Sequence, residues 1–234
     1  MEAGMTGKHL QAARKQKGWK QEHAALKLGV SQAYLSLLEK DARRVPEKLA
    51  VKAVRVYGLS EALLPVETGW DQPSIVDDDR LASELAALGY PGLSHFSHGR
   101  HKKNPAQLLL SALSRDDLDS RLIEALPWVV LKFPDLDWRW LANAAKINDL
   151  QNRLGFVTSV ARRLAERREK HETAALLARE ESALERSRLM REDTLCHASL
   201  TETERRWLRK NRPREAKHWR LLTDLTPEQL DYAI

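Results

Sequence analysis

The stretch QEHAALKLGVSQAYLSLLE, residues 21–39, decides the fold of the N-terminal part of this 234-residue chain. Its apolar residues recur at helical spacing on both sides of Gly29, which favours two short helices joined by a tight turn. Glycine readily adopts the positive φ angle that ends a helix, and Ser31 is a good N-cap for the helix that follows. Two helices joined by a short glycine-containing turn form a helix-turn-helix. The alternative is an ordinary helical hairpin.

Flanking patterns complete a small helical domain around this stretch. We interpret residues 31–40 as the helix that enters the DNA major groove, and residues 8–17 as a first helix. A fourth helix is expected after Pro46, a residue that suits the first helical position, and it should end at Gly58. The leucines of residues 59–64 finish the domain. The sequence therefore predicts an all-α, five-helix N-terminal domain.

Residues 8–64 resemble the helix-turn-helix domain of the Cro/cI (XRE) type found in phage repressors. The positions that match the pattern of this family are Leu10, Ala13, Arg14, Gly18, Trp19, Gln21, Ala25, Leu28, Gly29, Val30, Ser31, Tyr34, Leu35, Leu38 and Glu39. The resemblance implies that Gln21 meets phosphate and that the exposed start of the third helix reads bases. The expected DNA-binding residues are Gln21, Ser31, Gln32, Ala33, Tyr34, Ser36, Leu37, Lys40, Arg43 and Arg44.

The chain departs from the family pattern at two places. The family usually has a short Gly- or Pro-bearing loop after its third helix, whereas this chain has KDARRVP at residues 40–46. Leu37 also stands where a polar residue that reads bases is more usual. The base preference of the family therefore does not transfer to this chain.

Positive charge is concentrated in the same segment. The chain has 39 Lys and Arg residues and 33 Asp and Glu residues, which gives a formal net charge of +6. Residues 1–64 contain 12 basic and 6 acidic residues, and the rest of the chain contains 27 of each. The whole excess thus lies on the helix-turn-helix segment, which indicates a polyanionic partner such as double-stranded DNA.

Residues 65–80 change in composition, with two prolines, a glycine and the acidic run Asp77, Asp78 and Asp79. We interpret them as a linker between an N-terminal domain at residues 1–64 and a second domain at residues 81–234. Three adjacent carboxylates could suggest a metal site, but capping of the next helix is the favoured interpretation.

The second domain is predicted to be all-α and larger than the first. Strand signals are weak apart from the short run WVVL at residues 128–131. Helical patterns follow one another at residues 81–89, 105–113, 117–131, 137–148, 150–169, 171–191, 202–211, 213–222 and 227–233. Thr201 and Glu204 have the spacing of a capping box at the start of one of them.

One tryptophan, a group of three tryptophans and a group of three histidines each allow two interpretations. Trp19 could pack in the N-terminal core or meet the DNA backbone, and core packing is favoured. The tryptophans at 128, 138 and 140 could form a core, which is favoured, or a partner-binding surface. His95, His98 and His101 could bind zinc, but they lack a helical i, i+4 pair, so a polar loop is favoured.

The sequence contains none of the common catalytic motifs: no phosphate-binding glycine loop, no HExxH and no GxSxG. Cys196 and His197 are adjacent, which does not give the geometry of a nucleophile and its base. We therefore expect no enzyme activity, cofactor or metal. The single cysteine and the lack of a run of about 20 apolar residues indicate a cytoplasmic protein with no membrane span.

Residues 117–232 resemble, in general texture, the C-terminal part of helix-turn-helix antitoxins found beside nucleotidyltransferase-type toxins of the abortive-infection class. The resemblance implies a bacterial antitoxin that represses its own operon and counteracts a toxin protein. The alternative is a stand-alone repressor of the XRE family whose helical domain dimerises or senses a small ligand. In both cases we expect a homodimer on a palindromic operator, associated with the nucleoid when bound.

Overall fold

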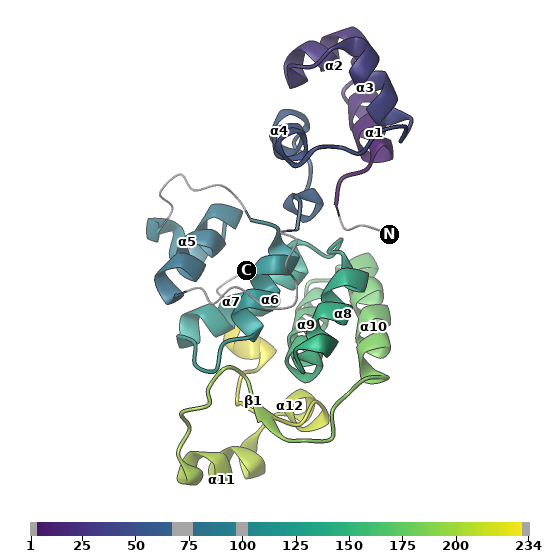
Figure 1. Cartoon of the computed structure of the whole chain (residues 1–234). Coiled ribbons are helices and arrows are strands. Elements are labelled where there is room, and N and C mark those ends of the chain that lie inside the picture. Colours follow the sequence, from purple (N-terminus) through teal and green to yellow (C-terminus); the bar gives the residue numbers. More distant parts are fainter. Residues whose placement is uncertain (1–3, 67–76, 97–102, 231–234) are drawn as a thin grey trace. The chain divides into compact units, whose positions relative to one another are not determined.

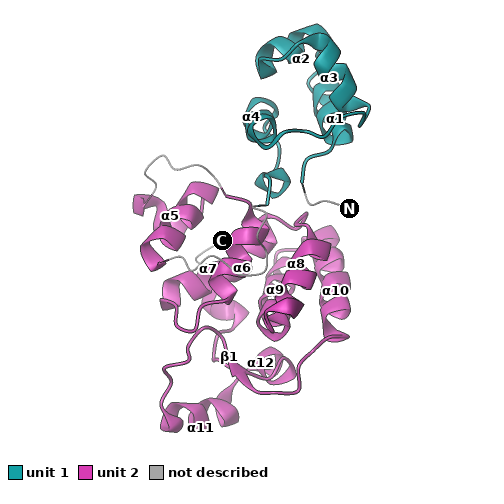
Figure 2. Cartoon of the chain, viewed as in Figure 1, with its two compact units in different colours: residues 1–68 teal, residues 69–234 magenta. Residues whose placement is uncertain are grey.

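The computed structural model describes residues 4–66, 77–96 and 103–230. Within these ranges nearly all regular structure is helical, and strands account for only two short pairs of residues. The predicted all-α class is therefore confirmed. The chain divides into two compact units, residues 1–68 and 69–234, coloured separately in Figure 2. Each unit has a hydrophobic core of its own.

The described residues of the N-terminal unit, 4–66, form four α-helices and one 3-10 turn, which takes the place of the predicted fifth helix. These elements are α1 (Gly7–Gln16), α2 (Gln21–Leu28), α3 (Gln32–Glu39), α4 (Glu47–Tyr57) and η1 (Glu61–Leu63) (Figure 1). Leucines at helical spacing, among them Leu10, Leu28, Leu35 and Leu38, fill the core and are almost completely buried. Because the helices are short, tertiary packing of these apolar faces supplies most of their stability.

The predicted turn between α2 and α3 is confirmed in detail. Gly29 ends α2 with φ 70° and ψ 37°, the left-handed conformation that glycine adopts most readily. The hydroxyl oxygen of Ser31 accepts a hydrogen bond from the backbone N–H of Tyr34 at 3.2 Å and so caps α3. Pro46 lies at the N-cap of α4, one position before the first helical residue where it was expected.

The C-terminal unit is a bundle around α9. Its elements are α5 (Asp78–Leu88), η2 (Pro91–Phe96), α6 (Pro105–Leu113), α7 (Ser120–Lys132), α8 (Trp138–Ile147), α9 (Gln151–Arg167), α10 (His171–Glu185), α11 (Glu202–Asn211), α12 (Arg214–His218) and η3 (Pro227–Leu230). Helix α9 packs against α7, α8, α10 and α12, and Figure 1 shows it beside α8. Residues 151–161 of α9 are buried all round, as expected of a central helix.

Two helix predictions in this unit were too long. The predicted helix at 171–191 ends at Glu185, and the one at 213–222 ends at His218. Arg220 has φ 56°, so the backbone leaves the helix there. Leu221–Leu222 instead form strand β2, which pairs in parallel with β1 (Asp193–Thr194). A strand this short depends on a partner far away in the sequence, and local periodicity cannot reveal that partner.

The start of the C-terminal unit supports the capping interpretation of the acidic run. Asp77 is the N-cap of α5, and its carboxylate accepts the N–H of Arg80 at 2.7 Å. The helix begins at Asp78 rather than at residue 81, and most of the predicted linker, residues 67–76, lies outside the described residues. The capping box of Thr201 and Glu204 is also confirmed.

The tryptophan cluster forms core structure, as favoured. Trp128 is buried, with its ring centroid 5.2 Å from that of Tyr90 and 6.3 Å from that of Phe133. Trp138 and Trp140 are half-buried and pack against the same core. The run at 128–131 belongs to α7, not to a strand. Of the three clustered histidines only His95 falls within the described residues.

No helix in the described part of the chain is both long enough and apolar enough to cross a membrane.

Candidate nucleic-acid interface

Helix α3 presents two faces of different character. Leu35, Leu38 and Glu39 are buried against the rest of the N-terminal unit. Gln32 and Ala33 are exposed, Ser36 is half-buried, and Leu37 has 41% of its surface exposed. Gln32 lies one helical turn before Ser36, and Ala33 lies one turn before Leu37. The four residues therefore form one continuous stripe. We call this stripe, made of Gln32, Ala33, Ser36 and Leu37, the outer stripe of α3.

The outer stripe unites four of the predicted DNA-binding residues. Tyr34 points elsewhere, because its ring is half-buried and packs against the core of the unit. Ser31 is exposed, but its hydroxyl oxygen is used to cap the helix. In this arrangement Tyr34 and Ser31 hold the start of α3 in place, while the outer stripe faces away from the core.

A buried polar network fixes the opposite face of α3. Arg14 on α1 donates two hydrogen bonds to Glu39, Nε to Oε1 at 2.6 Å and Nη2 to Oε2 at 2.9 Å. Gln21 at the start of α2 donates from Nε2 to the same Oε2 at 2.9 Å. Arg14 also donates to the carbonyl oxygen of Trp19 at 3.0 Å. One carboxylate therefore ties together the three helices that carry the interface.

Electrostatics keep this network ionised. Burial alone would raise the pKa of Glu39, but the hydrogen bonds from Arg14 and Gln21 outweigh it and lower that pKa. The bond to Glu39 raises the pKa of Arg14. Burial raises the pKa of neighbouring Tyr57 to about 12, so its phenol is neutral.

Gln21 was predicted to meet phosphate, and its position is compatible with that role. A glutamine amide carries two N–H donors, and the structure uses one of them for Glu39. Gln21 lies in the first turn of α2, where backbone N–H groups also favour an anion. Trp19, immediately before α2, packs as core, with its ring centroid 5.6 Å from that of Tyr57.

The loop after α3 carries the predicted basic residues Lys40, Arg43 and Arg44, all of which are exposed. The loop is anchored by Asp41, whose carboxylate accepts the N–H of Gly7 at 2.7 Å. A Cβ atom on Gly7 would lie 1.8 Å from the carbonyl oxygen of Leu38, so only glycine permits this close approach. The anchor positions the basic loop at the end of the outer stripe.

Sequence reasoning missed two features of this site, the positioning roles of Arg14 and Glu39 and the anchor at Asp41. Arg14 and Glu39 both match the family pattern, but nothing local indicates that residues 25 apart form a pair. The unusual sequence of residues 40–46 was a signal for Asp41, and it was interpreted only as a departure from the family.

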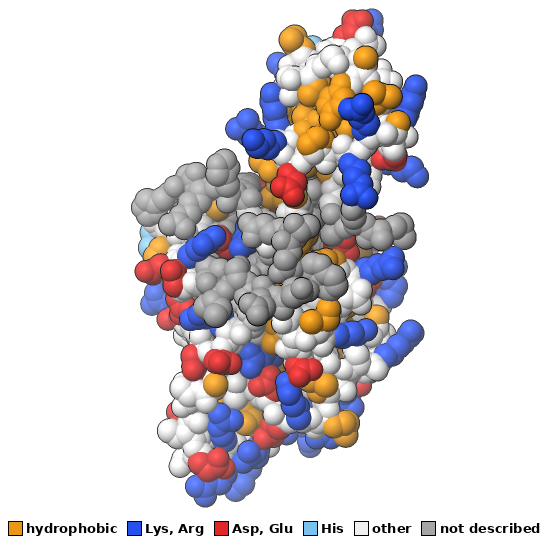
Figure 3. Space-filling model, in the orientation of Figure 1, with side chains coloured by type: hydrophobic (Ala, Val, Ile, Leu, Met, Phe, Trp, Pro, Cys, Tyr) orange, Lys and Arg blue, Asp and Glu red, His pale blue; other side chains and the backbone are white. Residues whose placement is uncertain are grey.

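In the view of Figure 3, lysine and arginine side chains are scattered over the N-terminal unit around a patch of hydrophobic side chains. Among those close to α2 and α3 in sequence, Lys20, Lys27, Lys40, Arg43 and Lys48 are exposed. Exposed cations beside a stripe that can reach base edges are the combination that DNA binding requires, since phosphate contacts position a protein and base contacts specify the sequence.

The adjacent residues Cys196 and His197 lie in the C-terminal unit, away from the helix-turn-helix in sequence. The Cys196 thiol is buried, which raises its pKa to about 11, and it lies 3.5 Å from the carbonyl oxygen of Ala112. A protonated buried thiol is a packing group rather than a nucleophile. The part of the chain that the structure describes contains no group of three or more His, Cys, Asp or Glu residues that could hold a metal ion.

Comparison with known families matches residues 10–64 to the family described as Helix-turn-helix. The match covers the four α-helices almost completely, together with η1, and supports a DNA-binding regulator of the XRE type. No curated protein and no solved structure gives a significant match to the chain.

Proposed function

We propose that this chain is a transcriptional repressor that binds a palindromic operator as a symmetric dimer. The observation that carries the proposal is the outer stripe of α3, exposed beside basic residues while the opposite face of the helix is held by Arg14, Glu39 and Gln21. Such a helix can enter a major groove without rearranging. Phosphate contacts from Lys40, Arg43 and Arg44 would then set its register.

The dimer follows from the size of the reading surface. An eight-residue helix offers only a few base contacts, too few for the affinity typical of operators. Two copies placed about 34 Å apart read successive major grooves and double the contacts.

Selection from random duplexes tests this proposal. The full chain should enrich a sequence with two-fold symmetry and bind it much more tightly than a scrambled duplex at the same salt concentration. Sedimentation of the complex should give two chains per duplex. Enrichment of no sequence, or a single chain on the selected duplex, would contradict the proposal.

A second role concerns the C-terminal unit. The resemblance of residues 117–232 to antitoxins supports the proposal that this unit counteracts a nucleotidyltransferase-type toxin, with the repressor controlling the shared operon. Co-expression with the product of the neighbouring gene tests it. The chain should rescue growth from that product, and rescue should survive Gln32→Ala, which alters only the outer stripe. A neighbouring product without toxicity, or toxicity that the chain does not relieve, would remove this role.

The alternative is a repressor whose C-terminal unit senses a small ligand. A pocket of about 770 Å³ in this unit favours it, since such volumes are usual for small-molecule sites. In either case we propose that both units act by binding rather than by catalysis, in the bacterial cytoplasm. The buried, protonated thiol of Cys196 agrees with a role in binding rather than catalysis.

A further inference from the structure

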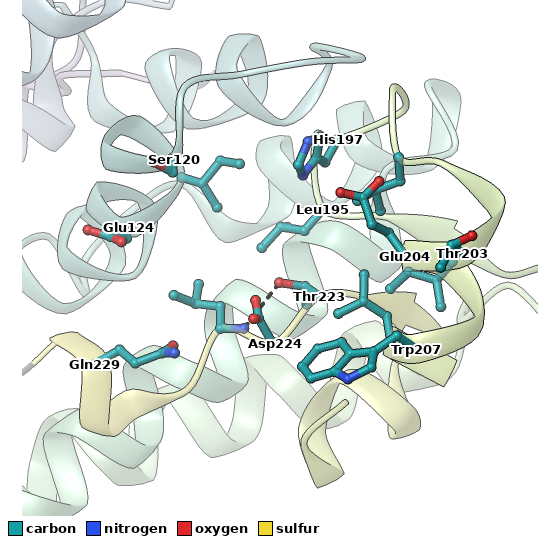
Figure 4. A pocket seen from close by; sticks show the side chains of 15 residues that line it. Ser120, Glu124, Leu195, His197, Thr203, Glu204, Trp207, Thr223, Asp224 and Gln229 are labelled. Carbon is teal, nitrogen blue, oxygen red and sulfur yellow. Dashed lines mark hydrogen bonds between the residues drawn. The ribbon is translucent and has the colours of Figure 1, made fainter. Parts of the chain in front are cut away.

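The pocket of the C-terminal unit lies among four segments: the first turns of α7, the loop after β1, helix α11 and the segment between β2 and η3 (Figure 4). Its volume is about 770 Å³. Much of its wall is apolar, with contributions from Ile123, Leu195, Leu200, Trp207, Leu208 and Leu225. A concave apolar site of this size suits a drug-sized organic molecule.

Three carboxylates and one histidine, His197, are the ionisable groups that line the pocket, beside neutral hydroxyl and amide side chains. Glu124, Glu204 and Asp224 line it, each from a different element, as Figure 4 shows. None of the described residues that line the pocket is Lys or Arg. The absence of Lys and Arg from the lining contrasts with the nearby sequence, because residues 202–220 alone contain eight Lys and Arg residues. The pocket is thus an acidic, apolar site set within a basic stretch of sequence.

Glu204 is held in place as an anion. Its Oε2 accepts hydrogen bonds from the backbone N–H and the hydroxyl of Thr201, both at 2.7 Å. These two bonds lower the pKa of Glu204, so the carboxylate is charged at neutral pH. The charge therefore belongs to a fixed position on the wall and not to a freely moving side chain.

Trp207 supplies an aromatic face on the same wall. It lies three residues after Glu204 on α11, so the two side chains share one side of the helix. Trp207 has 54% of its surface exposed, which is high for so large an apolar residue. In Figure 4 the indole ring points away from the carboxylate of Glu204, so it forms a separate aromatic part of the wall on which an apolar or aromatic ligand body can pack.

We propose that this pocket binds a lipophilic organic cation, with its apolar body against the leucines and the indole of Trp207 and its positive centre toward the carboxylates of Glu204 and Asp224. The inference rests on the ligand-sensing alternative for the C-terminal unit and names the chemical class of the ligand. It does not depend on DNA binding.

Titration of the full chain with tetraphenylphosphonium, without DNA, tests the proposal. In separate titrations tetraphenylborate serves as the matched probe, because it has nearly the same size and shape and the opposite charge. The cation should bind one per chain and about ten times more tightly than the anion does at the same site. Failure of the cation to saturate the chain at millimolar concentration would overturn the proposal.

Two matched variants locate the site. Glu204→Gln removes the charge but keeps a side chain that can complete a capping box, and it should weaken cation binding about five- to tenfold. Glu202→Gln makes the same change in the same turn of α11, outside the pocket lining, and should leave the affinity unchanged. Equal affinities in these two variants would overturn the proposal.

Two further variants keep the test decisive. Asp224→Asn removes a carboxylate that takes no part in the capping box, and it should also weaken the cation severalfold. Trp207→Leu keeps an apolar wall without a ring and should weaken cation binding about fivefold. If neither change alters cation binding, the pocket is not the site. A failed titration leaves the DNA-binding proposal intact, and failed operator selection leaves the pocket intact.

Discussion

In the N-terminal unit, Arg14 and Glu39 join helices across 25 residues of sequence, whereas in the C-terminal unit Arg153 joins segments 40 residues before it and 40 residues after it. Arg153 donates to both oxygens of Asp193, at 2.8 and 3.0 Å. Its Nη1 donates to the carbonyl oxygens of Leu113 and Arg115, at 2.9 and 2.8 Å. The first network orients a helix that faces a partner. The second holds distant parts of a bundle together.

The difference shows that a buried arginine can serve recognition or assembly. The N-terminal network joins three helices through one carboxylate, so its main effect is the angle at which α3 presents its outer stripe. In the C-terminal unit Arg153 satisfies two backbone carbonyls as well as a carboxylate, whereas Arg14 reaches one carbonyl, that of Trp19. The loss of Arg153 should therefore affect folding first.

The largest expected effect belongs to Arg153→Met, which removes the charged donor of Asp193 and a donor of two backbone carbonyls, and leaves Asp193 with the backbone N–H of Thr194 at 2.7 Å. We expect a loss of about 3–5 kcal/mol in the free energy of unfolding of the C-terminal unit. Denaturant titration followed by circular dichroism, with hydrogen exchange to separate the units, measures it. Arg191→Met is the matched control, since the Arg191–Asp149 ion pair is largely exposed and should contribute under about 1 kcal/mol. Similar losses in both variants would contradict the assigned role of Arg153.

Arg14→Met should destabilise the N-terminal unit by about 2–3 kcal/mol, because it leaves the buried carboxylate of Glu39 without its main partner. DNA affinity should fall even at temperatures where the unit remains folded, since α3 loses its fixed orientation. Anisotropy titrations on the selected operator, beside melting curves, test both parts. If the folded Arg14→Met chain bound DNA with wild-type affinity, the network would stabilise the N-terminal unit without affecting DNA binding.

The pH dependence of the same unit gives an independent check. The pKa of Glu39 is lower in the folded unit than in the unfolded chain, so between these two values the unfolded chain binds more protons. The stabilisation by Glu39 is present above its unfolded pKa and is lost as the pH falls through its folded pKa. Glu39→Gln should flatten this acidic slope in denaturant titrations at several pH values. An unchanged slope would mean that other carboxylates produce it.

Gln32→Ala changes the outer stripe without touching the network. If Gln32 reads a base, its loss should cost about 1–3 kcal/mol of binding at one base position and relax the preference there. Repeating the duplex selection with the variant locates that position. Gln16→Ala, an exposed glutamine at the end of α1, should leave the selected sequence unchanged.

The smallest effect is expected for Arg43→Ala. An arginine that meets phosphate should weaken binding to all sequences alike and reduce the slope of log affinity against log salt concentration by about 0.9. Affinities at four or more salt concentrations measure that slope. Lys146→Ala, exposed on α8 of the other unit, serves as the charge-matched control. An unaltered slope for Arg43→Ala would mean that Arg43 does not contact phosphate.

Prediction from sequence succeeded where the signals are local. The left-handed Gly29, the Ser31 cap and the capping box of Thr201 and Glu204 all follow from residues within four positions of one another. The outer stripe followed from helical periodicity. Tyr34 was predicted to lie beside the reading face, and the structure adds that it is half-buried and packs against the core; its contact with DNA stays a prediction.

The sequence by itself determined the helical class and the helix-turn-helix, because caps, turns and a 3.6-residue periodicity operate over a few residues. Only the tertiary structure decided which residues lie side by side across long stretches of chain. It joined Arg153 to Asp193, paired β1 with β2, and assembled the acidic pocket from residues between 120 and 229. These contacts depend on how apolar helix faces pack, and packing is a property of the whole fold rather than of any one segment.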